Sequence, residues 1–186
     1  MADIAEIIER WDSGEGKPYK GSLIDWSAYE ADPTNIGCMC AQGQVLHLLA
    51  GWGPDKLRST EQRDADRETA KLLNISIAHA ILLRSINDKA DGAPSIVLTN
   101  PEKILGDQAH IILAFWLHLD RMTDEDWQRV IAAGAAAWDA AWDAAYAASE
   151  IQGAALVRER GQPFFFLPMF GFAAPEAVLA VEGVSA

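Results

Sequence analysis

The two cysteines of the chain stand close together in the segment GCMCAQGQVLHLL, residues 37–49. The apolar spacing of this segment predicts a helix that begins near Cys38, directly after a glycine. A thiol at a helix N-terminus is stabilised as the thiolate, because the helix dipole is positive at that end. Cys38 and Cys40 are therefore the candidate catalytic residues of a thiol-dependent enzyme.

A base or a metal partner for these thiols is harder to identify. On a helix that begins near Cys38, the side chains of Cys40, Gln44 and His47 share one face. Cys40 and His47 nevertheless lie about 10.5 Å apart along the helix axis, too far for a hydrogen bond or a shared metal ion. A CxC pair with one remote histidine also falls short of a tetrahedral zinc site. We therefore predict no metal and no cofactor, and burial on a core helix is the commonest explanation of such cysteines.

Two other polar groups could carry chemistry. The turn NDKADG, residues 87–92, gathers polar side chains on one loop, as functional loops often do, but asparagine, aspartate and glycine also satisfy ordinary turn geometry. His110 and His118 share one predicted helix, where they are about 12 Å apart, so the pair alone cannot chelate a metal. Both groups are more typical of structural roles.

An alanine-rich repeat, AAAWDAAWDAAYAA, supplies a row of aromatic side chains. Its period of four residues is close to the 3.6 residues of a helical turn, so successive rings drift by only about 40°. The rings therefore form one stripe on a long helix, and Glu150 continues its register. We predict that this stripe binds a ligand or partner, together with two polar residues of the cysteine-containing segment. The predicted binding residues are Trp138, Trp142, Tyr146, Glu150, Gln44 and His47.

The elements that position these residues are helical, so we predict an all-α fold: a single-domain bundle of about six to seven helices. A helix is expected over residues 2–11, and residues 22–37 are expected to be irregular. Ser59 with Gln62 has the form of a capping box that opens a helix to Leu73. Asn74 is typical of a helix C-terminus, and Ser76 of the N-cap of a central helix near 76–87.

The C-terminal half is also expected to be mostly helical, but the segments between its helices are longer and less regular. The run SIVLT, residues 95–99, could form a short strand, and Asp107 can cap the helix that follows. Thr123 with Asp126 is expected to open the long alanine-rich helix to about residue 160. An extended aromatic strap and a short helix from Glu176 to Val181 complete residues 161–186. The predicted regions within the domain are 1–36, 37–122, 123–160 and 161–186.

Composition limits the class of protein. The 186 residues are 50% hydrophobic and 23% charged, as in ordinary globular domains. A formal net charge of −12 disfavours direct binding to nucleic acid or to anionic membranes. We found neither a signal-peptide pattern nor an apolar stretch of membrane-spanning length, so the expected location is cytoplasmic. Common catalytic and nucleotide-binding motifs, including the Walker loop, HExxH and GxSxG, do not occur.

The segments CMCAQGQVLHLLAG, SIAHAILLRSIND, WDAAWDAAYAASEIQGAA and PFFFLPMFGF carry a family resemblance. The chain resembles uncharacterised bacteriophage and prophage proteins in which an Ala-Trp-Asp or Ala-Arg-Asp tetrad is repeated a variable number of times. The resemblance covers about residues 36–172. It implies a phage or mobile-element setting, where small acidic proteins often bind a host factor, and it carries over no catalytic residue.

Three functions remain open at this stage. The leading hypothesis is a non-catalytic binding protein that engages a host or defence protein or sequesters a small ligand. The alternative is a thiol-dependent enzyme that uses Cys38 or Cys40. A second alternative is an acidic mimic of nucleic acid, which requires carboxylates to line one continuous ridge, such as those of Asp124, Asp126, Asp139, Asp143 and Glu150.

Overall fold

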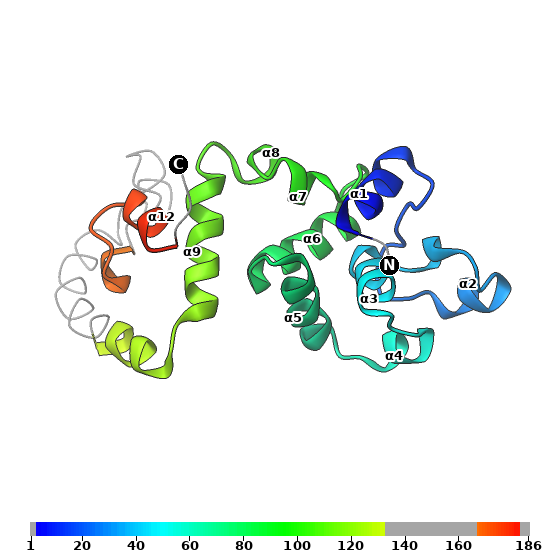
Figure 1. Ribbon diagram of the computed structural model, residues 1–186, viewed down its shortest axis with the longest axis horizontal. Helices are drawn as coiled ribbons and strands as arrows, with labels where there is room; N and C mark the ends of the chain where they lie inside the picture. Colours follow the sequence, from blue (N-terminus) through cyan, green and yellow to red (C-terminus); the bar gives the residue numbers. More distant parts are fainter. Residues whose placement is uncertain (1–2, 133–166, 183–186) are drawn as a thin grey trace, which may run out of the picture. The chain divides into compact units, whose positions relative to one another are not determined.

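The computed structural model describes residues 3–132 and 167–182, and it confirms the predicted all-α fold (Figure 1). The described residues contain helices and no strand, apart from one isolated antiparallel bridge between Ile24 and Met39. None of the helices in these two ranges combines the length and the apolar character needed to cross a bilayer. The chain forms two compact units, Met1–Leu117 and His118–Ala186.

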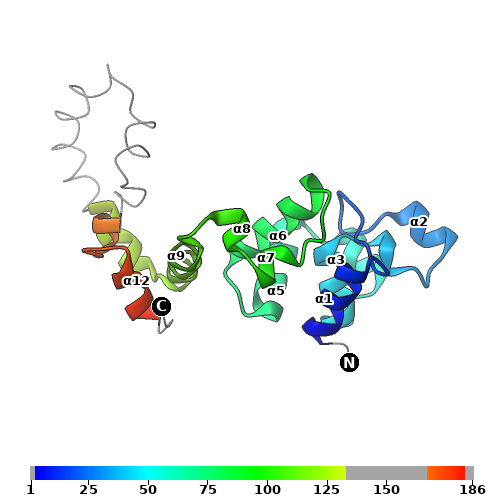
Figure 2. The same ribbon diagram turned by 90° about the horizontal axis from the view of Figure 1, so that it is seen from above.

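The first unit opens with two short helices, each started by an aspartate. Helix α1 (Ile4–Ser13) begins where Asp3 accepts a hydrogen bond from the Glu6 backbone N–H, and it ends at Gly14, whose φ of 81° is left-handed. Helix α2 (Trp26–Ala31) is capped by Asp25 and lies in a segment for which we predicted irregular structure. That prediction was wrong, because a local cap starts a helix too short to show a periodic pattern. Figures 1 and 2 both place α2 at an end of this unit, away from α6.

Helix α3 (Ala41–Ala50) is the central helix of the first unit. It contacts α1, α4 (Pro54–Ser59), α5 (Gln62–Leu73) and α6 (Ile77–Lys89), as Figure 1 shows. Its side chains enter two separate clusters of buried apolar residues, one through Leu46 and the other through Val45. Our assignment of the central position to the helix near 76–87 was wrong: Ile81 on α6 is 38% exposed, whereas every residue of α3 from 41 to 46 is buried.

The start of α3 also differs from the prediction. A 3-10 turn, η1 (Ile36–Cys38), precedes it, and Met39 between the two elements has extended backbone. This extended residue pairs with Ile24, and the backbone N–H of Cys40 donates to the Leu23 carbonyl. Long-range pairing with residues 23–25 therefore moves the helix start from Cys38 to Ala41.

Some boundaries of α4, α5 and α6 occur where the local sequence signals predicted them, and one does not. Asn74 ends α5 with a φ of 52°, and the Ser76 hydroxyl caps α6 by accepting from the His79 backbone N–H, both as predicted. The capping box of Ser59 with Gln62 was wrong. Ser59 is the last residue of α4, and Glu61 precedes α5 without a side-chain cap.

The first unit continues through three helices that follow the 90–95 loop. These are α7 (Ile96–Thr99), α8 (Glu102–Leu105) and α9 (Ala109–Arg121), and the boundary between the two units falls within α9. The predicted strand over SIVLT is therefore a helical turn. Val97 of this turn is fully buried, and its carbonyl accepts a 2.8 Å hydrogen bond from His79 Nε2. The described residues contain no strand with which SIVLT could have paired.

The described part of the second unit contains a helix over 124–132, a 3-10 turn η2 (Leu167–Phe170) and α12 (Glu176–Glu182). Thr123 and Asp126 exchange the reciprocal hydrogen bonds that we predicted for a helix start. The α12 helix is also as predicted, whereas the aromatic strap is not extended where it is described, because Leu167–Phe170 is a 3-10 turn. The alanine-rich stripe lies outside the described residues.

Candidate functional site

Both candidate catalytic thiols are buried and held in the protonated form. Cys38 ends η1 and is 3% exposed, and Cys40 is the N-cap of α3 and is 1% exposed. Cys40 Sγ accepts a hydrogen bond from the Gly43 backbone N–H at 3.4 Å. Burial nevertheless outweighs this contact and raises the pKa of Cys40 to about 11, and burial also raises the pKa of Cys38. The expected activation by a helix dipole is therefore offset by desolvation.

The histidines do not supply a base for these thiols. His47 Nδ1 lies 2.8 Å from the Trp52 carbonyl oxygen, a local contact at the end of α3. His79 is buried against the Val97 carbonyl, and burial lowers its pKa. Within the described ranges no hydrogen bond joins a cysteine to a histidine, and no three histidine, cysteine or acidic side chains are grouped as metal ligands.

Alkylation of the native protein checks this conclusion. At pH 7 and 25 °C we expect iodoacetamide to modify Cys38 and Cys40 at least ~100-fold more slowly than a free cysteine, because both thiols are buried and protonated. The rate is measured by mass spectrometry of peptides from protein treated with and without 6 M guanidinium chloride. Rapid modification of either thiol in the native protein contradicts the expectation and restores the thiol-enzyme hypothesis.

Gln44 connects separate segments of the first unit through buried hydrogen bonds, so its side chain is not available to a ligand. It is fully buried, its Oε1 accepts a hydrogen bond from Trp11 Nε1 at 2.9 Å, and its Nε2 lies within 3.0–3.2 Å of the carbonyl oxygens of Gly16, Ile36 and Met39. The other predicted binding residue of this helix, His47, makes the local contact described above. Trp138, Trp142, Tyr146 and Glu150 lie outside the described residues.

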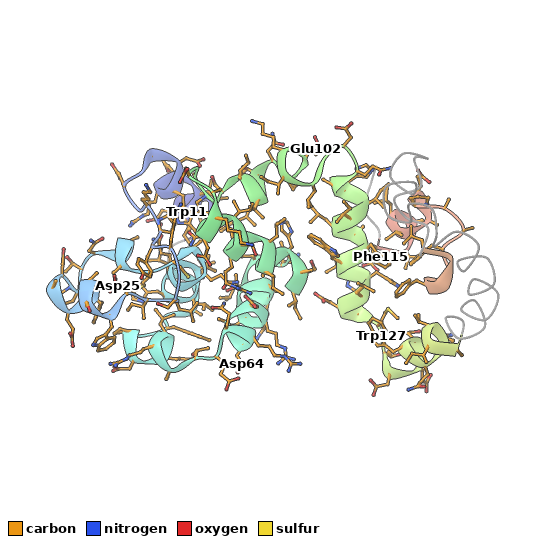
Figure 3. All side chains as sticks on the ribbon, turned by 180° about the vertical axis from the view of Figure 1, so that it is seen from behind. Trp11, Asp25, Asp64, Glu102, Phe115 and Trp127 are labelled. Carbon is orange, nitrogen blue, oxygen red and sulfur yellow. The ribbon has the colours of Figure 1, made fainter. Side chains whose placement is uncertain are left out.

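A hollow of about 440 Å³ is formed where residues 19–26 meet α4 and the first residue of α5. Its apolar lining comes from Leu23, Ile24 and Leu57, and its aromatic and polar lining includes Tyr19, Trp26, Arg58 and Gln62. Figure 3 shows Asp25, the residue before α2, among the side chains that gather at this end of the unit. The volume is within the range of small-molecule sites, which are commonly about 300–1,000 Å³.

Arg58 is positioned at this hollow by an aromatic ring. Its guanidinium carbon lies 4.5 Å from the centroid of the Trp26 ring, a cation–π contact. The indole is itself held in place, because its Nε1 donates to Glu30 Oε1 at 2.7 Å and its ring packs 5.6 Å from the Tyr29 ring. The arginine is thus pre-oriented although it is exposed to solvent.

A buried polar network lies behind the hollow and orients Gln62. Gln42 Nε2 donates to Asp66 Oδ1 at 2.8 Å and to the Ala80 carbonyl at 3.1 Å, so Gln42 Oε1 accepts from Gln62 Nε2 at 2.7 Å. Asp66 also receives two hydrogen bonds from Arg84, at 3.1 and 3.2 Å. The network commits the amide nitrogen of Gln62 to the protein interior.

Residues 87–92 are only partly a turn, because Asn87 and Asp88 lie in the last turn of α6 and the loop begins at Ala90. Their polar side chains bind residues 19–21, which lead into the hollow. Asn87 Nδ2 donates to the Tyr19 carbonyl at 2.8 Å, and Asp88 Oδ1 accepts from the Gly21 backbone N–H at 3.0 Å. Lys20 and Asp91 form an ion pair across the same junction. Hollows of about 240 and 660 Å³ border this turn, but the larger one has no aromatic lining residue. These contacts link the end of α6 and the loop after it to residues 19–21.

Sequence reasoning missed this hollow because Trp26 and Arg58 are 32 residues apart. Gly53-Pro54 was the available signal, since proline at the first position starts α4 and so orients Arg58.

Comparisons of the chain with protein-family models, with curated proteins and with solved structures found no match.

Proposed function

We propose that this chain is a non-catalytic binding protein that sequesters a small ligand in the hollow between residues 19–26 and α4. The observation that carries the proposal is the pairing of Arg58 with Trp26 at a hollow of about 440 Å³. A stacked arginine beside an apolar floor supplies both orientation and contact area, which are the features that small-molecule sites share.

The two alternative functions have weaker support. Thiol catalysis needs an accessible thiolate, and burial raises the pKa of both cysteines. Mimicry of nucleic acid needs free carboxylates along a ridge. Asp126, one of the acids in question, is engaged by Thr123 and Arg129, and Asp139 and Asp143 lie outside the described residues.

A protein partner is the second candidate, because two large apolar side chains on one helix of the second unit are exposed. Trp127 is 40% exposed and Ile131, one helical turn later, is 60% exposed. A host or defence protein that packs against these two side chains is consistent with the phage or mobile-element setting implied by the tetrad resemblance. We propose the cytoplasm as the compartment, since both cysteines are free thiols.

Two matched tryptophan variants test the small-ligand proposal. Trp26→Ala removes the ring beneath Arg58, whereas Trp52→Ala removes a ring that carries Lys56 at 3.7 Å and does not line the hollow. Protein purified from host cells is examined by native mass spectrometry, and bound small molecules are identified after denaturation. We expect a small molecule on the wild type and on Trp52→Ala, and at least tenfold less of it on Trp26→Ala.

The result is read together with circular dichroism, which shows whether each variant is folded. Equal retention by folded Trp26→Ala and by the wild type contradicts a ligand in this hollow. A wild type that carries no small molecule, and that no member of a metabolite panel stabilises against heat, contradicts the proposed function itself.

A further inference from the structure

We infer that the ligand of this hollow is a small ring-containing anion whose carboxylate or phosphate group is bound by Arg58. The inference rests on the proposed function and names the chemistry of its ligand. It follows from the hydrogen-bond donors of the lining, considered one by one.

Most donors that face this hollow are already committed to the protein. The Ser22 hydroxyl donates to the Ile24 carbonyl at 2.9 Å, and the Thr60 hydroxyl donates to the Lys56 carbonyl at 2.6 Å. The Gln62 amide nitrogen is bound to Gln42 and Asp66. These three side chains therefore offer a ligand their oxygen lone pairs, which attract hydrogen-bond donors and do not bind an anion.

Two side-chain donors of the lining remain: the Tyr19 hydroxyl, which is neutral, and Arg58, which is charged. The charged donor is the one that selects an anion. Among the described side chains that line the hollow it is the sole cation, and within the described parts of the chain it forms no ion pair with a carboxylate. The sole acid of that lining, Asp25, is the N-cap of α2 and accepts from the Ala28 backbone N–H. A guanidinium presents paired N–H groups that match carboxylate and phosphate oxygens.

The overall charge of −12 does not prevent an anion from binding here. Charges more than about 8–10 Å apart are largely screened at physiological ionic strength, so only nearby carboxylates compete with a bound anion. The two nearby acids are already engaged, because Asp25 accepts from the Ala28 backbone N–H and Glu30 accepts from Trp26 Nε1. The rings of Tyr19 and Trp26 complete the lining beside the apolar residues. An aromatic or other flat ring attached to the acid group can pack against these surfaces, and this contact favours a ring-containing anion over a bare ion.

Three probes of similar shape and different charge test the inference on the full-length protein. Benzoate and phenyl phosphate are anions, whereas benzamide is neutral. Each is titrated while the indole N–H signal of Trp26 is followed by ¹H–¹⁵N NMR, and the signal is assigned by its absence in Trp26→Phe. We expect benzoate or phenyl phosphate to shift this signal with at least tenfold higher affinity than benzamide.

Arg58→Gln is expected to weaken binding of the anion about tenfold or more, because it removes charge-assisted hydrogen bonds. Arg63→Gln is the matched control: it makes the same charge change on exposed α5 surface outside the lining. The tighter of the two anions identifies the acid group. If all three probes bind equally, or if Arg58→Gln behaves as Arg63→Gln, the anion inference is overturned while ligand binding stands. If none of them shifts the signal, the anion inference fails, and the proposed function is judged by the retention experiment.

Discussion

Gly43→Ala is expected to lower the free energy of unfolding by about 2–3 kcal/mol. Helix propensity alone favours the opposite result, because alanine in a helix interior is about 0.5–1 kcal/mol better than glycine. A Cβ at Gly43, however, would lie 2.1 Å from the carbonyl oxygen of Leu23. That oxygen belongs to the backbone and accepts the hydrogen bond of Cys40 N–H, so it cannot move without breaking the pairing that sets the start of α3. Steric overlap therefore outweighs propensity.

Urea denaturation followed by circular dichroism measures the effect. Gly92→Ala is the control, because a Cβ at Gly92 meets nothing within 4 Å, and its expected effect is within about 0.5 kcal/mol. Leu23 also forms part of the floor of the hollow, so Gly43→Ala should weaken ligand binding as well. A Gly43→Ala protein as stable as the wild type would show that residues 22–24 do not approach α3 as described.

The elements that the sequence predicted correctly are those whose signals are local. Asn74 adopts the left-handed conformation at the end of α5, and Ser76 and Thr123 each bind a backbone N–H three residues later. These outcomes depend on one side chain and its immediate backbone, so they can be deduced without the rest of the fold. Apolar spacing likewise located α1 and α3 to within a few residues.

Two local signals also misled, because the capping box of Ser59 with Gln62 does not form and the Asp25 cap of α2 was overlooked. The errors that affect the candidate site arose where distant segments meet. The start of α3 is set by pairing with Leu23 and Ile24, which no pattern within residues 37–49 reveals. The same pairing buries Cys38 and Cys40, so the thiols that a helix start was expected to activate are instead desolvated. The hollow combines residues 19–26 with 57–62 and depends on α4, a six-residue helix too short for periodicity. A candidate site of this kind is visible only after the chain has folded.

Arg84→Met is expected to lower the free energy of unfolding by about 3 kcal/mol, because it leaves a buried carboxylate without its cation. The Asp66 side chain is 7% exposed, and both of its oxygens accept hydrogen bonds from Arg84. Methionine keeps much of the side-chain volume, so the loss reports charge and hydrogen bonding more than packing. Urea denaturation at pH 7 is the measurement. Arg67→Met provides the control, since its ion pair with Asp64 is exposed and contributes at most about 1 kcal/mol.

The double variant Asp66→Leu with Arg84→Met separates the charge from the rest of the network. With the carboxylate gone, no unpaired charge is left in the interior, so the double variant should be more stable than Arg84→Met alone. If it is instead less stable, Asp66 is needed chiefly as the acceptor for Gln42 and Gln62. Ligand binding gives a second test of the role of Asp66, because the hollow is lined by Gln62 but not by Arg84. Anion binding that is unchanged in folded Arg84→Met but altered in the double variant would mean that Asp66, which binds the Gln62 amide nitrogen, sets the position of Gln62 in the lining.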